Sequence, residues 1–205
     1  MTRVALLGCA IMLIGSGTGA AQDTSGLARI EALLVRPQIL CGHFDQSKVL
    51  VGLTKPVKSS GRFCVVAGKG ILWRTLQPFA STLRLTRDEI IESRGDEVTQ
   101  RLSAAQEPGV RVINDLLFSL LAGDLRRLTD TFSVDGKVGR NSWDATLAPR
   151  GSGMRGIIAG IELSGDNYVD HVLIRETGGD MTVIAFSGFT AGARAMQPDE
   201  ARQFE

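Results

Sequence analysis

Hydrophobic residues recur at helical spacing in two segments of the chain. Over residues 25–36 the apolar side chains share one face, which predicts a helix that ends before Pro37. Over residues 108–132 a wider apolar stripe predicts two helical pieces that divide at Gly123, with Asp124 as the cap of the second. Each stripe needs an apolar surface to cover, because such a helix face is not stable alone in water.

Between and after these segments, hydrophobic and polar residues alternate in short runs, the pattern typical of half-buried strands. The predicted strands cover residues 44–53, 62–66, 71–75, 81–86, 89–93, 97–102, 142–147, 157–163, 167–175 and 181–187. Short turns rich in glycine and aspartate separate the last of them, which favours an antiparallel meander. The predicted fold class is therefore α+β, with a curved antiparallel sheet whose open side is covered by helices.

The first 21 residues have the features of a secretory signal peptide: Arg3, then the apolar run 4–14, then small residues. The apolar run is short for a bilayer core of about 30 Å, although a membrane anchor remains an alternative. A lipoprotein cleavage box over residues 6–9 is a second alternative. We therefore expect residues 1–21 to be removed and residues 22–205 to form one domain in the periplasm.

Composition excludes some classes of function. Among 205 residues, 23 Lys and Arg against 22 Asp and Glu give a net charge of +1, so no basic field is available for nucleic acid. Two histidines and three cysteines argue against a rich metal site, and we expect neither metal nor cofactor. Without residues 1–21 the remaining cysteines are Cys41 and Cys64, an even pair that predicts a disulfide in an exported protein. Two buried free thiols are the alternative.

Several short motifs do not support catalysis. Residues 151–156 match G-x-G-x-x-G, but a strand rather than a helix is predicted to follow, which argues against a dinucleotide site. Carboxylates between residues 166 and 180 lack the regular spacing of a calcium loop. A thiol nucleophile at Cys41 beside His43 is less favoured than a disulfide. We therefore expect a protein that is not an enzyme.

Several motifs occur in an order that resembles the LolA family of periplasmic lipoprotein carriers. They are Phe44-x-Gln46, Gly61-x-Phe63, Leu72-Trp73 followed by Pro78, Phe118-x-x-Leu121-x-Gly123-Asp124 and Asp180-x-Thr182-x-Ile184-x-Phe186. The resemblance implies an incomplete antiparallel β-barrel, a half-barrel, closed by helices over an apolar cavity. It also implies a carrier that takes an acylated lipoprotein from an inner-membrane exporter to an outer-membrane acceptor.

A carrier of acyl chains needs apolar area, because each buried CH₂ contributes about 0.8 kcal/mol. The predicted cavity wall consists of Trp73, Leu83, Leu85, Leu117, Phe118, Leu121, Phe132, Trp143, Leu147, Ile161 and Phe186. Ordinary core packing is the alternative for each of them. The resemblance further implies a basic residue that gates the helical lid, for which Arg62 and Lys69 are candidates; solvated surface charge is the alternative.

The expected partners are a lipoprotein or lipid cargo, the exporter and the acceptor, met in transient contacts by a monomer. Alternative functions are an envelope scaffold that binds protein, a carrier of another acylated product, and an enzyme acting on envelope lipid.

Overall fold

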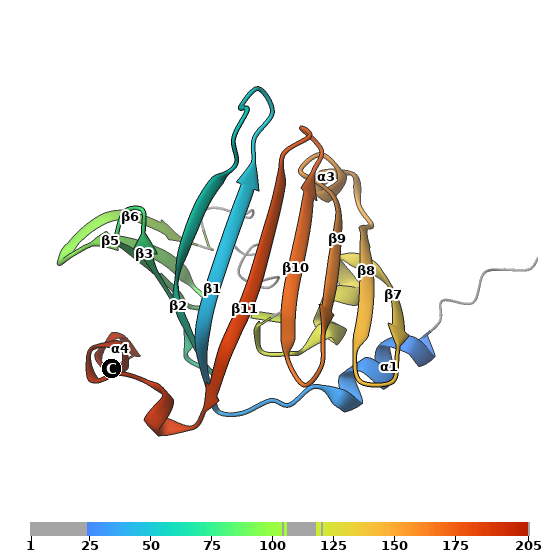
Figure 1. Cartoon of the computed structure of the whole chain (residues 1–205), viewed down its shortest axis with the longest axis horizontal. Helices are drawn as coiled ribbons and strands as arrows, with labels where there is room; N and C mark the ends of the chain where they lie inside the picture. Colours follow the sequence, from blue (N-terminus) through green and yellow to red (C-terminus); the bar gives the residue numbers. More distant parts are fainter. Residues whose placement is uncertain (1–23, 104, 106–117, 120, 205) are drawn as a thin grey trace, which may run out of the picture.

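The computed structural model describes residues 24–103, 105, 118–119 and 121–204 of the chain, and its main feature is one antiparallel sheet of 11 strands (Figure 1). The strands are β1 Ile39–Val49, β2 Val57–Val66, β3 Gly70–Gln77, β4 Ser81–Leu85, β5 Glu89–Arg94, β6 Glu97–Ser103, β7 Phe132–Val138, β8 Trp143–Pro149, β9 Ile158–Gly165, β10 Val169–Glu176 and β11 Met181–Ala191.

Two meanders join to make this sheet. Its strand order is β6-β5-β4-β3-β2-β1-β11-β10-β9-β8-β7, so each strand pairs with its sequence neighbour except where β1 pairs with β11. The order ends at β6 on one side and β7 on the other, and the sheet is therefore open. This confirms the predicted antiparallel sheet, including the hairpin of β5 and β6.

Helices are few in the described residues. They are α1 Thr24–Leu33, the 3-10 helix η1 Leu125–Asp130, α3 Ser152–Arg155, the 3-10 helix η2 Ala193–Ala195, α4 Pro198–Ala201 and the 3-10 helix η3 Arg202–Phe204. The helix predicted over residues 25–36 is confirmed as α1 with slightly different ends. The half-barrel with a helical cover is supported only in part, because most of the predicted helical segment 108–132 lies outside the described residues.

The prediction for the end of that helical segment was wrong. Residues 118, 119 and 121 are helical and η1 follows, but Phe132 begins β7 instead of ending a helix. The centre of β7 is the polar sequence Asp135-Gly136-Lys137, which has weak strand preference. Pairing along the whole length of β8 gives these residues their extended form. Phe132, Val134, Gly136 and Val138 nevertheless alternate with polar residues, so β7 also has the local pattern of a half-buried strand, which was missed because the helical stripe was extended to Phe132.

The two faces of the sheet bury different side chains. We call "inner face" the side on which Trp143, Ala145 and Leu147 of β8 point, each buried between exposed neighbours. Phe44 on β1 pairs with Phe186 on β11 and belongs to the same large buried cluster. The opposite side, the "outer face", carries a second small cluster. The inner face therefore holds the main core.

Helix α1 lies unusually close to edge strand β7. A Cβ atom at Gly26 would be 2.1 Å from the carbonyl oxygen of Gly136, and one at Gly136 would be 2.6 Å from Cδ1 of Ile30. Two glycines thus permit the helix backbone to contact the strand, and Ile30 is completely buried there. Glu31 of α1 also binds Arg126 of η1 at 2.8 Å, so one helix anchors both elements.

The C-terminal segment packs on the outer face (Figure 1). Elements η2, α4 and η3 place Met196 and Phe204 against the buried Cys41, Cys64 and Leu72. Cys41 and Cys64 are opposite each other on β1 and β2 and form a disulfide with an S–S distance of 2.08 Å. The predicted disulfide is confirmed.

Candidate functional site

Aromatic rings meet at the centre of the inner face, where β1, β2, β3 and β11 lie next to one another. The rings of Phe44 and Trp73 stack with centroids 3.8 Å apart, while Phe186 meets Trp73 edge-on at 5.9 Å and Phe63 at 5.1 Å. Phe189 extends the group, 6.2 Å from Phe63. Edge-to-face and offset rings are the arrangements that aromatic side chains favour, so this group gives the inner face a rigid apolar floor.

A glycine makes room for the stacked pair. A Cβ atom at Gly61 of β2 would be 1.9 Å from the carbonyl oxygen of Arg74 and 2.9 Å from the ring of Phe44. The strand register also shifts between Ser60 and Gly61, next to β3. Only a residue without a side chain fits between these neighbours, and this explains the glycine of Gly61-x-Phe63.

The structure brings most of the predicted cavity residues into one cluster on this face. Leu85, Leu121, Phe132, Trp143, Leu147, Ile161 and Phe186 are buried in it. Trp73, Leu83 and Phe118 are partly buried against it. Leu117 lies outside the described residues. That these side chains hold a ligand stays a prediction.

Sequence reasoning did not assign Phe44 and Phe63 to the site, although both are fully buried members of the cluster. Both residues occur in the motifs that carry the family resemblance, and both lie on the side of their strands opposite the cysteines. Strand alternation relative to Cys41 and Cys64 was therefore a signal that could have found them.

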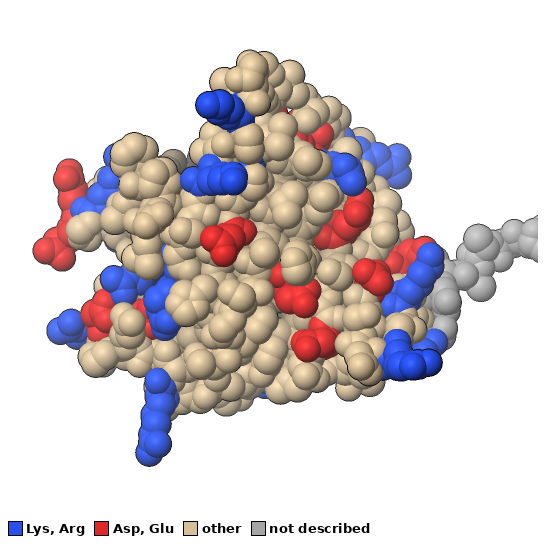
Figure 2. Space-filling view, in the orientation of Figure 1, with Lys and Arg blue, Asp and Glu red and all other residues tan. Residues whose placement is uncertain are grey.

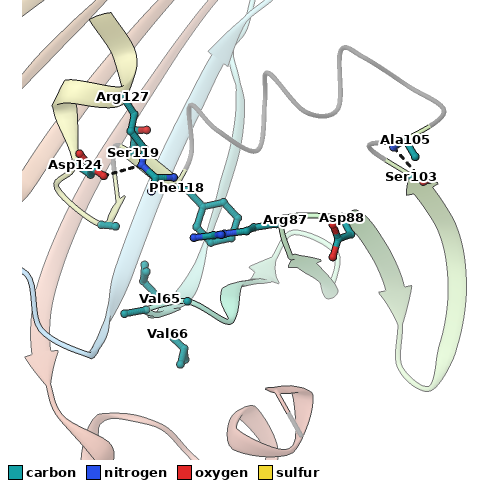
Figure 3. Close-up of a pocket in the computed structure, with 13 residues that line it drawn as sticks. Val65, Val66, Arg87, Asp88, Ser103, Ala105, Phe118, Ser119, Asp124 and Arg127 are labelled. Carbon is teal, nitrogen blue, oxygen red and sulfur yellow. Dashed lines mark hydrogen bonds and ion pairs between the residues drawn. The ribbon is translucent and has the colours of Figure 1, made fainter. Parts of the chain in front are cut away.

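A cavity of about 560 Å³ opens where the inner face meets the segment 118–127 (Figure 3). The turns between β2 and β3 and between β4 and β5 line one side of it. Its apolar wall includes Val65, Phe118 and Ala122. Of the residues predicted for a cavity wall, Phe118 alone is among its described lining residues.

Charged and hydroxyl side chains also line this cavity. Arg87 and Asp88 come from the turn after β4, and Arg127 of η1 forms an ion pair with Asp124 at 2.8 Å (Figure 3). Ser119 is 1% exposed, and its Oγ has no hydrogen-bond partner in the part of the chain that the structure describes. The cavity is therefore amphipathic, with an apolar wall next to charged and hydroxyl groups.

The two candidate gating residues contact the C-terminal segment. Arg62 donates a hydrogen bond from Nε to Oε1 of Glu200 at 3.1 Å, and Lys69 donates from Nζ to the carbonyl oxygen of Phe204 at 3.2 Å. Both partners belong to the outer-face layer, whereas Phe118, Leu121 and Leu125 pack against the inner face. These contacts favour a role in holding the C-terminal segment, and the gating role stays a prediction.

One group of potential metal ligands occurs among the described residues. Ligand atoms of Cys41, Cys64 and Glu200 lie within 4.8 Å of one another, all buried. The two sulfur atoms are bonded to each other, and the carboxylate accepts hydrogen bonds from Arg62 and from the backbone N–H of Gln197. The atoms that a metal would need are therefore engaged in structural bonds.

An open antiparallel sheet with an apolar inner face agrees with a match to a family model. The model described as "Outer membrane lipoprotein carrier protein LolA-like" matches residues 20–204. The chain belongs to this family. No curated protein matches it.

Solved structures similar to this LolA-like chain share little sequence with it. The LolA superfamily protein NE2245 from Nitrosomonas europaea is 9% identical, with a TM-score of 0.48 over 91% of this chain and 98% of that one. The Pseudomonas aeruginosa MucA/MucB complex is 15% identical, with a TM-score of 0.45 over 86% of this chain and 60% of that one. An outer membrane lipoprotein-sorting protein domain from Vibrio parahaemolyticus is 11% identical, with a TM-score of 0.44 over 87% and 97%.

Across the described residues, every helix is too short or too polar to span a bilayer.

Proposed function

We propose that this LolA-like chain is a periplasmic carrier that holds the acyl chains of a lipoprotein, or of a related lipid, and transfers them from the inner to the outer membrane. The observation that carries the proposal is the cavity of about 560 Å³ beside Val65, Phe118 and Ala122, in a chain of this family. Its volume lies in the range of about 300 to 1,000 Å³ that is usual for ligand pockets.

The physical basis is the removal of hydrocarbon from water. Burial of apolar surface contributes roughly 25 cal/mol per Å², so an acyl chain binds without a single hydrogen bond. The polar end of the cargo would lie beside Arg87, Asp88 and Ser119, which also line the cavity. The cavity thus offers different surroundings to the two ends of an amphiphile.

The remaining parts of the proposal follow from the family and from the N-terminal sequence. Export would depend on residues 1–21, which lie outside the described residues. The partners would be an inner-membrane exporter and an outer-membrane acceptor, met in turn by a monomer. Binding and release would shift the balance between open and closed forms of the segment that contains Phe118.

Titration of the purified protein with a fluorescent palmitoyl probe tests the proposal. We expect saturable binding, and an affinity on the order of tenfold lower for Phe118→Asp, because a carboxylate in the apolar wall opposes burial of hydrocarbon. Ala122→Phe fills the cavity without adding charge and should also weaken binding. Val35→Asp, at an exposed position of the loop after α1, is the matched control and should bind like the wild type.

Thermal unfolding of each variant separates lost binding from lost folding. Absence of probe binding by the wild type would overturn the proposal. It would also be overturned if Phe118→Asp and Ala122→Phe fold normally and bind the probe as tightly as the wild type does. Native mass spectrometry of protein purified from the periplasm would identify the cargo. A bound amphiphile without a peptide would favour a carrier of another acylated product, and a stable protein partner on an empty chain would favour the scaffold.

A further inference from the structure

Large exposed hydrophobic side chains gather at one end of the sheet. Because successive strands are antiparallel, the connections β1–β2, β3–β4 and β8–β9 all leave the sheet at the same end. Val51 and Leu53 in the first connection are 69% and 55% exposed, and Phe79 in the second is 81% exposed. Ile157 in the third is also exposed. Soluble proteins seldom concentrate exposed apolar side chains in this way without an interaction to serve.

The β1–β2 hairpin projects beyond the other strands (Figure 1). Its end is ordered by hydrogen bonds: the Leu53 N–H donates to the Leu50 carbonyl at 3.0 Å, and the Val51 N–H donates to Oδ1 of Asp180 at 2.9 Å. Gly52, with φ of 88°, forms the turn between them. The hairpin therefore holds Val51 and Leu53 outward in a fixed conformation.

The second apolar group lies beside this hairpin. Pro78, which precedes Phe79, lines a shallow groove together with Lys58 of β2. Gln77 also pairs with Ser60 across β2 and β3. The connection that carries the exposed Phe79 therefore begins beside the base of the hairpin.

Two exposed lysines lie beside these apolar residues, and the carboxylate of Asp180 is occupied by the Val51 N–H. The sequence contains no Asp or Glu between Asp45 and Asp88. Lys55 and Lys58 are exposed and form no ion pair with any residue that the structure describes, whereas Lys48 is paired with Glu176 at 2.8 Å. In Figure 2 the projecting end at the top of the view is tan, with basic groups beside it.

We propose that Val51, Leu53, Lys55, Lys58 and Phe79, here named the hairpin tip, bind the surface of an anionic phospholipid bilayer. Exposed aliphatic and aromatic side chains enter the boundary between headgroups and acyl chains, while lysines attract anionic headgroups. The negative charge of an anionic membrane complements the lysines of the tip. A projecting hairpin can also contact a flat surface, which the wall of a groove cannot. The tip brings the carrier to a membrane.

This site is separate from the cargo cavity. The cavity lies at the turns β2–β3 and β4–β5, which leave the opposite end of the sheet. Membrane binding is therefore measurable on the empty protein, and its failure leaves the carrier proposal standing.

Co-sedimentation with vesicles tests the proposal, using protein variants that share the same N-terminus. With equimolar phosphatidylglycerol and phosphatidylcholine we expect the wild type to sediment. Leu53→Asp and Phe79→Asp should each lower partitioning by on the order of tenfold, because an ionised side chain opposes entry into the bilayer boundary. The control is Val35→Asp, which adds the same charge at an exposed apolar position at the other end of the sheet and should leave partitioning unchanged.

The charge of the tip has its own test. A single lysine near an anionic surface contributes roughly a fivefold factor, so Lys55→Gln with Lys58→Gln should lower partitioning roughly 25-fold. Added salt should weaken wild-type binding, and vesicles of phosphatidylcholine alone should bind far less. All tip variants should keep the palmitoyl-probe affinity of the wild type.

Three outcomes would overturn the proposal: no sedimentation of the wild type, equal sedimentation of Leu53→Asp and Val35→Asp, or equal binding to neutral and anionic vesicles. Capture of a purified envelope protein that depends on Leu53, without vesicle binding, would assign the tip to a protein partner and would equally overturn it.

Discussion

Arg62 on β2 donates a hydrogen bond of 3.1 Å from Nε to Oε1 of Glu200, which follows 138 positions later in α4. Glu200 is 1% exposed, and the Gln197 N–H donates to its Oε2 at 2.8 Å. Sγ of Cys64 lies 3.5 Å from the same oxygen. The carboxylate therefore exchanges water for a charged partner and a backbone N–H, and it fixes the C-terminal segment over the disulfide.

Removal of this carboxylate should destabilise the protein. In Glu200→Ala, Arg62 loses its partner while it remains mostly buried, which costs about 3 kcal/mol in the free energy of unfolding. Urea unfolding followed by circular dichroism measures this value. Asp199→Ala is the matched control, because Asp199 is a more exposed partner of Arg74 and its loss should destabilise the protein clearly less than the loss of Glu200.

A double-mutant cycle separates the Arg62–Glu200 pair from the general loss of packing. Arg62→Ala with Glu200→Ala should cost clearly less than the sum of the two single variants, because the second change removes the uncompensated charge. Simple additivity would show that the two side chains act independently and would contradict the interpretation of the pair.

Local sequence patterns predicted the elements whose residues match their environment. The strand β8 alternates in the sequence as it does in the sheet, and α1 has an apolar face that includes the buried Leu27 and Ile30. The cysteine count predicted the bond between Cys41 and Cys64. In each of these cases the stabilising interaction is either local in the sequence or is a covalent bond between two cysteines, which are rare in this chain.

Features that depend on distant segments could not be predicted in the same way. β7 alternates apolar and polar residues, but Gly136 weakens the pattern and Phe132 also continues the helical stripe before it, so its pairing with β8 and its contact with α1 decide the assignment. The partners of Arg62 and Lys69 come from the last residues of the chain, where nothing local distinguishes Glu200 from a surface carboxylate. The hairpin tip likewise becomes visible only when exposure is known.

Close contact between α1 and β7 should make Gly26 intolerant of a side chain. The added methyl group of Gly26→Ala would be 2.1 Å from the Gly136 carbonyl oxygen, so the helix must move away from the strand. Overpacking of this kind costs about 1 to 3 kcal/mol, even though alanine favours the helix itself. Thermal unfolding measures the loss.

Gly153→Ala in α3 is the appropriate comparison, since no atom lies within 4 Å of a Cβ built there. This variant should be neutral or slightly more stable, because the change only reduces the freedom of the unfolded chain. A Gly26→Ala protein as stable as Gly153→Ala would show that α1 does not depend on its close approach to β7.

Acid should weaken the attachment of the C-terminal segment through Asp199. Desolvation raises the pKa of this carboxyl group, but the attraction of Arg74, with hydrogen bonds from Arg74 and the backbone, outweighs it and holds the pKa below its usual value of 3.8. A group with a lowered pKa stabilises the fold above the pKa of the unfolded chain, and this contribution is lost as the pH falls through the pKa of the folded state. We therefore expect the stabilising contribution of Asp199 to be lost at pH values below about 4.

NMR titration of the Asp199 carboxyl carbon measures this pKa directly. In Arg74→Gln the attraction disappears while desolvation remains, so the pKa of Asp199 should rise relative to that of the wild type. Hydrogen exchange in α4 of the wild type should become faster as the pH falls below about 4, and this acid-dependent increase should be smaller in Arg74→Gln, because that variant lacks the ion pair at every pH. If the pKa is the same in both proteins, then the Arg74–Asp199 contact is too well screened by solvent to hold the segment in place.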